Sequence, residues 1–386
     1  MRLVYLSDSP IPSREANGFH VMRMCQAFGQ AGHEVTLIGQ NCPVYGEPGI
    51  DDVFDFYHVD PVFAVQRIKR LKVKGWGLLY GWQAARMAKK QAPDLVYSRN
   101  LWGAAIVARM GLPVVFEAHT LKFLSAPMHR RMALHMMRQK SFQRLVVISG
   151  VLQEDCLAEL AAMGVPEEID LQVAHDGADL LPADFPARNF PGAAGGRLQV
   201  GYCGSLYPGK GAEKIPALAK QCPWADFHIA GGSNEALKKF QEQFDTPPNL
   251  QLHGFLPSRE AASFCLGCDI LLAPNQPQVL LGGPKTDIGR WTSPLKIFEY
   301  MASAKPILCS DLTVLREILT DGKTGILLPP DDLRAWARAL AFLRDHPEER
   351  HRLGENARQD LKMNFTWKSR AESVLKNLAI MEIGND

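Results

Sequence analysis

The sequence predicts an α/β protein built from two doubly wound, Rossmann-like domains that face a central cleft. Three observations support this fold class. The length of 386 residues suits two domains of ordinary size, short apolar runs alternate with helix-length amphipathic segments, and the alternation occurs in two separate series. Ligands of open parallel sheets bind beyond the carboxyl ends of the strands, so we expect functional residues in the loops that follow them.

The first series begins at the N-terminus. Its predicted strands cover 3–6, 35–39, 95–97, 114–119 and 145–149, and its predicted helices cover 19–31, 101–110 and 127–143. The second series has predicted strands at 198–204, 226–232, 250–255, 269–274, 306–311 and 324–330, with helices at 211–221 and 295–303.

The two series are separated by a stretch rich in Pro, Gly and Ala, at residues 180–196. We therefore predict an N-terminal domain at 1–182, a linker at 183–196 and a second domain at 197–364. A final helix candidate at 364–380 follows the second domain. We expect the C-terminal segment 365–386 to pack back on the first domain, with Trp367 as its anchor.

The composition is that of an ordinary globular protein, with 46% apolar residues, 22% charged residues and a formal net charge of +2. The first residues lack the apolar core of a secretory signal, so we expect a cytoplasmic protein. We expect no nucleic-acid partner, no cofactor and no metal. The eight cysteines suit reduced core thiols, and the single pair Cys265 and Cys268 leaves a metal or redox site as the less favoured alternative.

Positive charge is concentrated in the first domain. Residues 61–150 hold 16 Lys and Arg against two acids, and the run RIKRLKVK at 67–74 is the densest part. Two interpretations stay open. The basic region 67–144 docks on anionic lipid at the inner face of the membrane, or it is a solvated surface that acids elsewhere balance.

Two loops of the first domain carry candidate acceptor-binding residues. Asn17 and Gly18 precede a helix whose unpaired N–H groups could face a hydroxylated substrate or a phosphate; the alternative is a simple helix cap. Glu117 and His119 lie on one face at the end of an apolar strand. There the histidine could hydrogen-bond a substrate, or it could be a structural histidine with a satisfied partner.

The second domain opens with GYCGSLYPGKG at 201–211. Gly204 and Ser205 follow a strand, and Lys210 precedes a helix. Glycine permits close backbone approach and lysine supplies a point charge, a combination that suits a diphosphate.

The stretch RWTSPLKIFEYM at 290–301 gives the strongest prediction of a site. Thr292 and Ser293 precede Pro294, which predicts a hydroxyl-capped helix start whose free N–H groups face an anion. Glu299 would follow one turn later, about 6 Å along the axis from the helix start, the separation between a phosphate and a ribose diol. The alternative is a surface pair between Lys296 and Glu299. Because the helix is mainly apolar, we expect Glu299 to be buried and favour the site.

These segments resemble a known family. G-S-x-x-x-x-K-G (204–211), IAGG (229–232), LHGFL (252–256) and SPLKIFEYMASAKPILCSD (293–311) are similar to glycosyltransferase family 4, which comprises retaining enzymes of the GT-B fold. They indicate the branch with an SPLKIFEYMA-type donor motif. HDGAD at 175–179 also resembles the family's HNGVD.

The resemblance implies a role for each matched position. His119, Lys210 and Glu299 would be the catalytic residues, with His119 near the transferred sugar and Glu299 on the ribose hydroxyls. The donor would be bound by the loop glycines, the residues near the base and the start of the motif helix: Gly204, Ser205, Lys210, Gly232, Gly254, Phe255, Arg290, Ser293, Pro294, Leu295, Lys296 and Glu299.

Two positions depart from the family pattern. Ser205 replaces the usual arginine, so Arg290 or Lys296 would supply the missing charge. Trp291 stands where the family has its first glutamate, eight residues before Glu299, which removes a usual partner of the sugar hydroxyls.

The resemblance therefore predicts a metal-independent hexosyltransferase. It would move a sugar from a UDP- or GDP-sugar to a hydroxyl of a glycan or lipid-linked acceptor, in cell-surface polysaccharide or glycolipid synthesis. A nucleotide-sugar-binding protein with lost activity, a GT-B epimerase and a phosphorylase are the alternatives.

Overall fold

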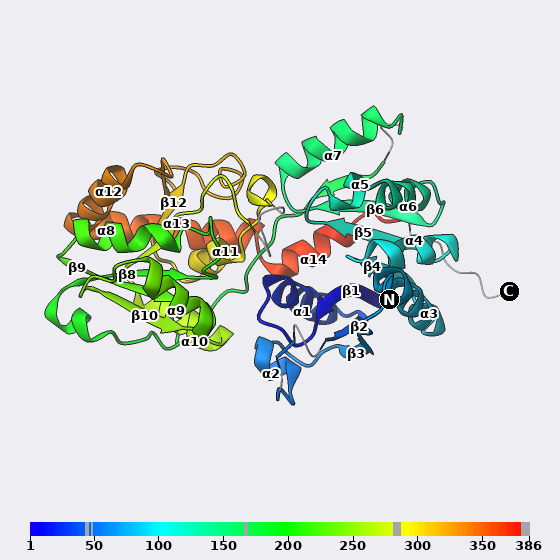
Figure 1. Cartoon of the computed structure of the whole chain (residues 1–386), viewed down its shortest axis with the longest axis horizontal. Helices are drawn as coiled ribbons and strands as arrows, with labels where there is room; N and C mark the ends of the chain where they lie inside the picture. The colour runs from blue at the N-terminus through cyan, green and yellow to red at the C-terminus, as the bar shows by residue number, and fades with distance from the viewer. Residues whose placement is uncertain (43–45, 48, 166–168, 281–286, 380–386) are drawn as a thin grey trace. The chain divides into compact units, whose positions relative to one another are not determined.

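The computed structural model describes residues 1–42, 46–47, 49–165, 169–280 and 287–379. The chain divides into two compact units (Figure 1). The first comprises Met1–His175 and Trp367–Asp386, and the second comprises Asp176–Thr366. No helix within the described ranges combines the length and the apolar character needed to cross a membrane.

The first unit is a seven-stranded sheet with the order β3-β2-β1-β4-β5-β6-β7, and each pairing is parallel. The strands are β1 (Arg2–Pro10), β2 (Glu34–Asn41), β3 (Ala64–Lys69), β4 (Leu95–Ser98), β5 (Val114–Ala118), β6 (Phe142–Val147) and β7 (Leu171–Val173). The helices are α1 (Ala16–Gln30), α2 (Val53–Tyr57), α3 (Trp76–Lys90), α4 (Leu101–Arg109), α5 (Lys122–Ser125), α6 (Pro127–Met137), α7 (Gly150–Ala162) and α14 (Trp367–Leu375).

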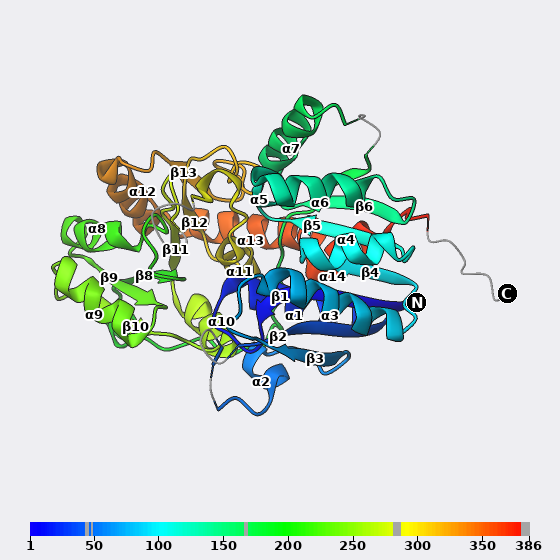
Figure 2. The same cartoon turned by 45° about the vertical axis from the view of Figure 1, so that its right-hand side comes forward.

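Helix α14 returns to the first unit from the far end of the sequence. It lies beside α1 in both views (Figures 1 and 2). At its start, the buried Trp367 ring packs edge-on against His20, with ring centroids 5.3 Å apart. At its end, the buried Arg144 guanidinium donates to the backbone oxygens of Val374 and Lys376, at 3.2 and 3.1 Å. Residues 380–386 of the predicted C-terminal segment lie outside the described residues.

The second unit is a six-stranded parallel sheet with the order β10-β9-β8-β11-β12-β13. The strands are β8 (Leu198–Cys203), β9 (Ala225–Ala230), β10 (Leu250–Gly254), β11 (Ile270–Ala273), β12 (Ile307–Ser310) and β13 (Ile326–Leu328). The helices are α8 (Ile215–Gln221), α9 (Asn234–Gln243), α10 (Ser258–Gly267), α11 (Leu295–Ala302), α12 (Leu333–Asp345) and α13 (Pro347–Asn364), with 3-10 turns η1 (Pro191–Gly195), η2 (Ala212–Lys214) and η3 (Gly289–Trp291).

The predicted linker 183–196 lies within the second unit, which begins at Asp176. Phe190 is buried and stacks on the buried His228 at a centroid distance of 4.0 Å, and η1 follows it. The Pro and Gly content indicated irregular backbone, but an irregular segment still packs when it carries an aromatic anchor. The expectation of a separate linker is therefore corrected.

Both sheets are doubly wound, and each has one point where the winding reverses. In the first unit β1 and β4 are neighbours at this point, and in the second unit β8 and β11 are. Ligands of such sheets bind at the carboxyl ends of the strands beside the reversal. The loops after β1 and β4 in the first unit and after β8 and β11 in the second, together with those of the adjacent strands, are therefore the places to look for a site.

Candidate active site

In the second unit, the loops after β8, β9 and β10 meet through glycine backbone. The Gly231 N–H donates to the Gly254 carbonyl at 2.6 Å. Gly231 has φ +128°, and a Cβ on it would lie 1.9 Å from the Gly204 carbonyl oxygen. Gly232 follows with φ +78°. The predicted donor residues Gly204, Gly232 and Gly254 thus belong to one surface, and the double glycine is what lets its loops touch.

The loop that carries Lys210 is held by a carboxylate that sequence reasoning missed. Gly209 and Gly211 flank Lys210, both with positive φ. Their N–H groups donate to the two oxygens of Glu213, each at 3.1 Å. A carboxylate that accepts two backbone N–H groups fixes the loop around the lysine. Burial lowers the pKa of Lys210 to about 8.

Lys296 connects this loop to α11. Its Nζ donates to the Lys210 carbonyl at 3.1 Å and lies 4.5 Å from the centre of the Tyr202 ring. Its stem passes Gly204, where a Cβ would lie 3.6 Å from the Lys296 Cδ. Burial, and then the charge of Lys210, lower the pKa of Lys296 to about 7. The three predicted donor segments at 204, 210 and 296 are therefore in contact.

The start of α11 differs from the prediction. Pro294 is the N-cap residue, no side chain caps the helix, and the first turn begins at Leu295. The Thr292 hydroxyl instead donates to the Ile288 carbonyl at 2.7 Å, and the Ser293 hydroxyl accepts from the Asp176 N–H at 3.2 Å. Both hydroxyls have partners outside the helix, so the expected hydroxyl cap is not formed. An uncapped helix start leaves its N–H groups available to an anion.

The expectation that Glu299 is buried is wrong. Its side chain is exposed, whereas Lys296 is buried with 7% exposure. Leu295 and Glu299 are four residues apart and share the outer face of α11, while 296–298 and 300–302 face inward. The sequence suggested a buried Glu299 because most residues of this eight-residue helix are apolar. Only one side of the helix points outward, and Glu299 lies on it.

The other predicted donor residues surround this surface at different depths. Phe255 and Ser205 are half-buried, and the Ser205 carbonyl accepts from the Tyr202 hydroxyl at 2.7 Å. Arg290 is exposed on η3, next to the half-buried Trp291. Of the two candidates for the missing arginine charge, Lys296 donates a hydrogen bond to the Lys210 loop.

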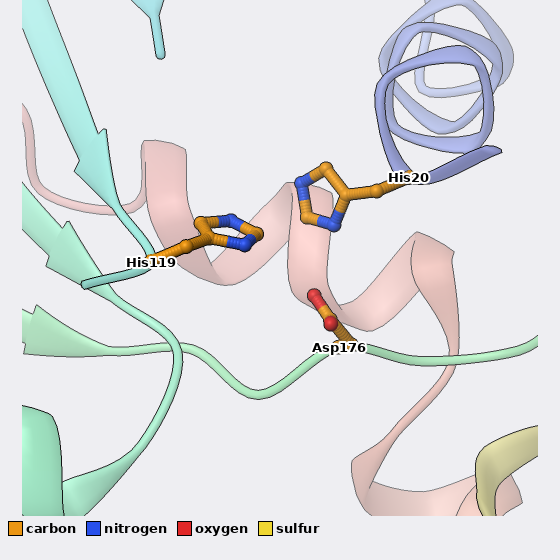
Figure 3. Close-up of side chains that lie close together, drawn as sticks. All are labelled: His20, His119 and Asp176. Atoms are coloured by element: carbon orange, nitrogen blue, oxygen red, sulfur yellow. The ribbon is translucent and has the colours of Figure 1, made fainter. Parts of the chain in front are cut away.

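In the first unit, Glu117 is the centre of a buried hydrogen-bond cluster. Its Oε2 accepts from the Tyr97 hydroxyl and from the Arg370 guanidinium, the latter at 3.1 Å. Its Oε1 lies 2.5 Å from His119 Nε2 and 2.8 Å from His20 Nε2. Figure 3 shows the two imidazole rings, which lie edge to face with centroids 4.9 Å apart. Tyr97 and Arg370 thus donate to Oε2, and His119 bonds Oε1, with His20 Nε2 close to the same oxygen.

This cluster determines which ring nitrogen of His119 carries the hydrogen. Burial alone would raise the pKa of Glu117, but the charges of Arg370 and His20 and the bonds from both histidines hold it well below the usual range. An ionised carboxylate has no hydrogen to donate, so His119 Nε2 carries the hydrogen. Burial, and then the charge of Arg99, lower the pKa of His119 to about 4. A neutral ring with its hydrogen on Nε2 presents Nδ1 as an acceptor.

Glu117 itself does not fit the predicted acceptor-binding role. Its side chain has no exposed area, and its oxygens are taken by the protein. We therefore correct the expected role to one of holding His119, which keeps 22% side-chain exposure. His20, Tyr97 and Arg370 were missed because they come from distant parts of the sequence and match no local motif.

The loop after β1 brings Asn17 and Gly18 to the start of α1. Gly18 is required there, because a Cβ would lie 2.7 Å from the Tyr57 hydroxyl. That hydroxyl accepts from the Ser13 N–H and donates to the Ser13 carbonyl. The Asn17 Oδ1 is buried and accepts no hydrogen bond from the described residues. An unused acceptor in the first turn of α1 is consistent with ligand contact.

Two family models match the chain, and together they span both units. The model "Glycosyltransferase Family 4" matches residues 18–180, and the model "Glycosyl transferases group 1" matches residues 186–360.

Similar proteins include an MMP alpha-(1->4)-mannosyltransferase of Mycolicibacterium hassiacum, 37% identical over 97% of each chain. A phosphatidyl-myo-inositol mannosyltransferase of Mycolicibacterium smegmatis is 26% identical, over 83% of this chain and 79% of its own.

Among solved structures, Anabaena HepE in complex with UDP and glucose aligns with a TM-score of 0.69 at 15% identity, over 97% of this chain and 98% of its own. Sucrose-phosphate synthase from Thermosynechococcus elongatus aligns with a TM-score of 0.70 at 16% identity, over 97% of each chain. These likenesses establish the GT-B fold. The chain is an enzyme that belongs to glycosyltransferase family 4.

Proposed function

We propose that the enzyme transfers a hexosyl group from a UDP- or GDP-sugar to a hydroxyl of a glycan or lipid-linked acceptor, with retention at the anomeric carbon. The observation that carries this proposal is the contact of Gly204, Lys210 and Lys296 beside the uncapped start of α11. Two cationic side chains and free N–H groups at a doubly wound sheet edge suit a nucleoside diphosphate.

The donor would lie across the loops of the second unit. Lys210, Lys296 and the backbone N–H groups of Ser293, Leu295 and Lys296 would bind the diphosphate. The exposed Glu299, one turn further along α11, would accept hydrogen bonds from the ribose hydroxyls, which an outward-facing carboxylate can reach. Gly254 and Phe255 would contact the base. Trp291 would lie near the sugar, where the family has a glutamate.

The sugar and the acceptor would contact the first unit. His119 Nδ1 would accept a hydrogen bond from a sugar hydroxyl, and Asn17 with Gly18 would contact the acceptor. In the reaction, the bond between the anomeric carbon and the diphosphate oxygen breaks, and the acceptor oxygen bonds that carbon on the same face. The acceptor proton passes to the leaving diphosphate oxygen. Lys210 and the α11 start would stabilise the charge that develops there without a divalent metal.

Mannosyl is the first sugar to test, because two relatives are named mannosyltransferases. The assay mixes the enzyme with GDP-mannose, UDP-glucose or UDP-galactose and a panel of mono- and oligosaccharide acceptors. NMR of the product then gives the anomeric configuration. We expect one donor to be used, an α-linked product from an α-linked donor, and no loss of rate with EDTA. Donor binding with neither transfer nor hydrolysis would contradict an active enzyme.

Variants test the site assignment. Lys210→Ala and Glu299→Ala should each abolish turnover. The first removes the positive charge that would bind the diphosphate, and the second removes the carboxylate that would accept hydrogen bonds from the ribose hydroxyls. Lys214→Ala is the matched control, since Lys214 follows the same loop but pairs with Asp331. Turnover that persists in both site variants would contradict the assignment, as would an equal loss in the control.

Peripheral contact with anionic lipid would bring the enzyme to a lipid-linked acceptor in cell-surface polysaccharide or glycolipid synthesis. The supporting surface lies at and after β3, where Leu71 and Val73 are 42% and 51% exposed and alternate with Lys72 and Lys74. Each basic residue near such a surface contributes about 1 kcal/mol. Flotation with phosphatidylglycerol vesicles should retain the protein at low salt and release it at high salt. Equal recovery with phosphatidylcholine vesicles, or no change in a Lys72→Glu, Lys74→Glu variant, would contradict docking.

A further inference from the structure

Arg99 occupies the point in the first unit where the winding of the sheet reverses. It is the first residue after β4, and its N–H donates to the Leu6 carbonyl of β1 at 2.9 Å. β1 and β4 are the neighbouring strands at which the strand order of the sheet reverses. His119 follows β5, the next strand along, so the two side chains leave the same edge of the sheet. This edge is where an open α/β sheet binds its ligand.

The Arg99 guanidinium lacks a full set of partners. Its side chain is only 12% exposed, and its Nη1 is buried with no hydrogen bond to any described residue. Among the described residues its one ion-pair contact is long, with Nε 3.9 Å from Glu117 Oε1. A guanidinium presents five donors in a rigid fork, and a buried donor without an acceptor is costly. Arg99 is therefore a cation whose buried Nη1 donor has no acceptor among the described residues.

The carboxylates nearby do not fill this need. Glu117 bonds Tyr97, Arg370 and His119, its Oε1 also lies 2.8 Å from His20 Nε2, and Arg370 balances its charge. Asp8, on β1, makes no hydrogen bond or ion pair with Arg99 in the described part of the chain, although Arg99 and Arg70 both act on it electrostatically. Arg99 and Arg370 are therefore matched in number by Glu117 and Asp8, but neither carboxylate accepts a hydrogen bond from the buried Nη1 of Arg99.

We propose that Arg99 binds a phosphate group carried by the acceptor, so that the enzyme prefers phosphorylated over neutral acceptors. A planar guanidinium fork matches phosphate oxygens, so a phosphate could accept from the Nη1 that has no partner among the described residues. The inference rests on the proposed transferase function and adds the chemical class of its acceptor. The phosphate has two sources, a soluble sugar phosphate or a phosphorylated lipid-linked sugar.

The test measures kcat/KM for matched acceptor pairs with the preferred donor. The soluble pair is mannose and mannose 6-phosphate, and the lipid-borne pair is octyl mannoside and its 6-phosphate. We expect the phosphorylated member of at least one pair to be preferred about 10- to 100-fold, the range of one to two charge-assisted hydrogen bonds. The pair that shows the preference identifies the source. This wild-type ratio needs no variant, and a ratio near one in both pairs overturns the inference.

Variants show whether Arg99 is responsible. Arg99→Gln should bring the ratio close to one, and Arg99→Lys should keep part of it because the charge remains. Arg109→Gln, an exposed arginine at the end of α4, is the matched control and should keep the wild-type ratio. A phosphate preference that survives Arg99→Gln overturns the assignment, and a purely structural role would lower stability without changing the ratio. Failure of the transferase function itself looks different, since no donor would then be bound or turned over.

Discussion

The two units build their candidate sites by different physical means. In the second unit, half-buried glycine backbone and two lysine side chains, of which Lys296 is buried, form the site, and the residues lie in short sequence motifs. In the first unit, a buried carboxylate collects His20, Tyr97, His119 and Arg370 into one cluster. The first design permits close backbone approach to a ligand, and the second orients one side chain. The difference implies that a substitution in the first unit should cost mainly stability, and one in the second mainly ligand affinity.

The largest expected effect comes from Glu117→Ala. It leaves the buried Arg370 without its carboxylate, which should lower the free energy of unfolding by about 3–5 kcal/mol. Glu299→Ala is the control in the other unit. Its exposed side chain should cost no more than about 0.5 kcal/mol while turnover is lost. Urea unfolding of both variants measures the contrast, and equal destabilisation would break the comparison.

A smaller effect is expected from Gly231→Ala. Alanine at this positive φ is strained and would also meet the Gly204 carbonyl at 1.9 Å, so the loops of the second unit must separate. Gly322→Ala shares the strain, about 1–2 kcal/mol, but meets nothing within 4 Å. Calorimetric titration with UDP and GDP should show weaker binding for the first variant alone. Equal affinities in the two variants would mean that the glycine contact does not shape the site.

The sequence predicts these two regions unequally, and the reason is physical. Glycine turns and a helix start are local features, so Gly204, Lys210 and the helix near 295 could be named from short motifs. The carboxylate cluster depends on tertiary folding, because Arg370 reaches Glu117 across 253 residues of chain. A local sequence pattern also fails to predict which face of a helix is exposed. An apolar helix suggested that Glu299 is buried, yet its side chain occupies the one exposed face of α11.

Strand boundaries show the same limit. The basic residues at 67–69 lie in β3, which the sequence did not predict as a strand because its apolar residues are few and its face is largely exposed. The expected hydroxyl cap of α11 failed because Thr292 and Ser293 found partners at 288 and 176, which no local rule supplies.

The remaining prediction concerns the dependence of stability on pH. Burial lowers the pKa of His119 and of His228 from 6.5 to about 4. Between these values the unfolded chain binds a proton that the folded chain does not, so stability is full above pH 6.5 and declines as pH falls toward 4. Each histidine contributes at most about 1.4 kcal/mol per pH unit to this slope. His119→Asn and His228→Gln should each flatten the dependence of unfolding free energy on pH. An unchanged slope in both would show that these rings titrate normally.

The central claim is that the second unit binds the nucleotide and the first unit contacts the sugar. Calorimetric titration of wild type, Lys210→Ala and His119→Asn with free GDP and UDP tests it without any acceptor. We predict that Lys210→Ala weakens binding of the preferred nucleotide by about 10- to 100-fold, the range of a lost charge-assisted hydrogen bond, and that His119→Asn changes it less than about twofold. Equal losses in the two variants, or a larger loss in His119→Asn, would contradict the division of labour between the two units.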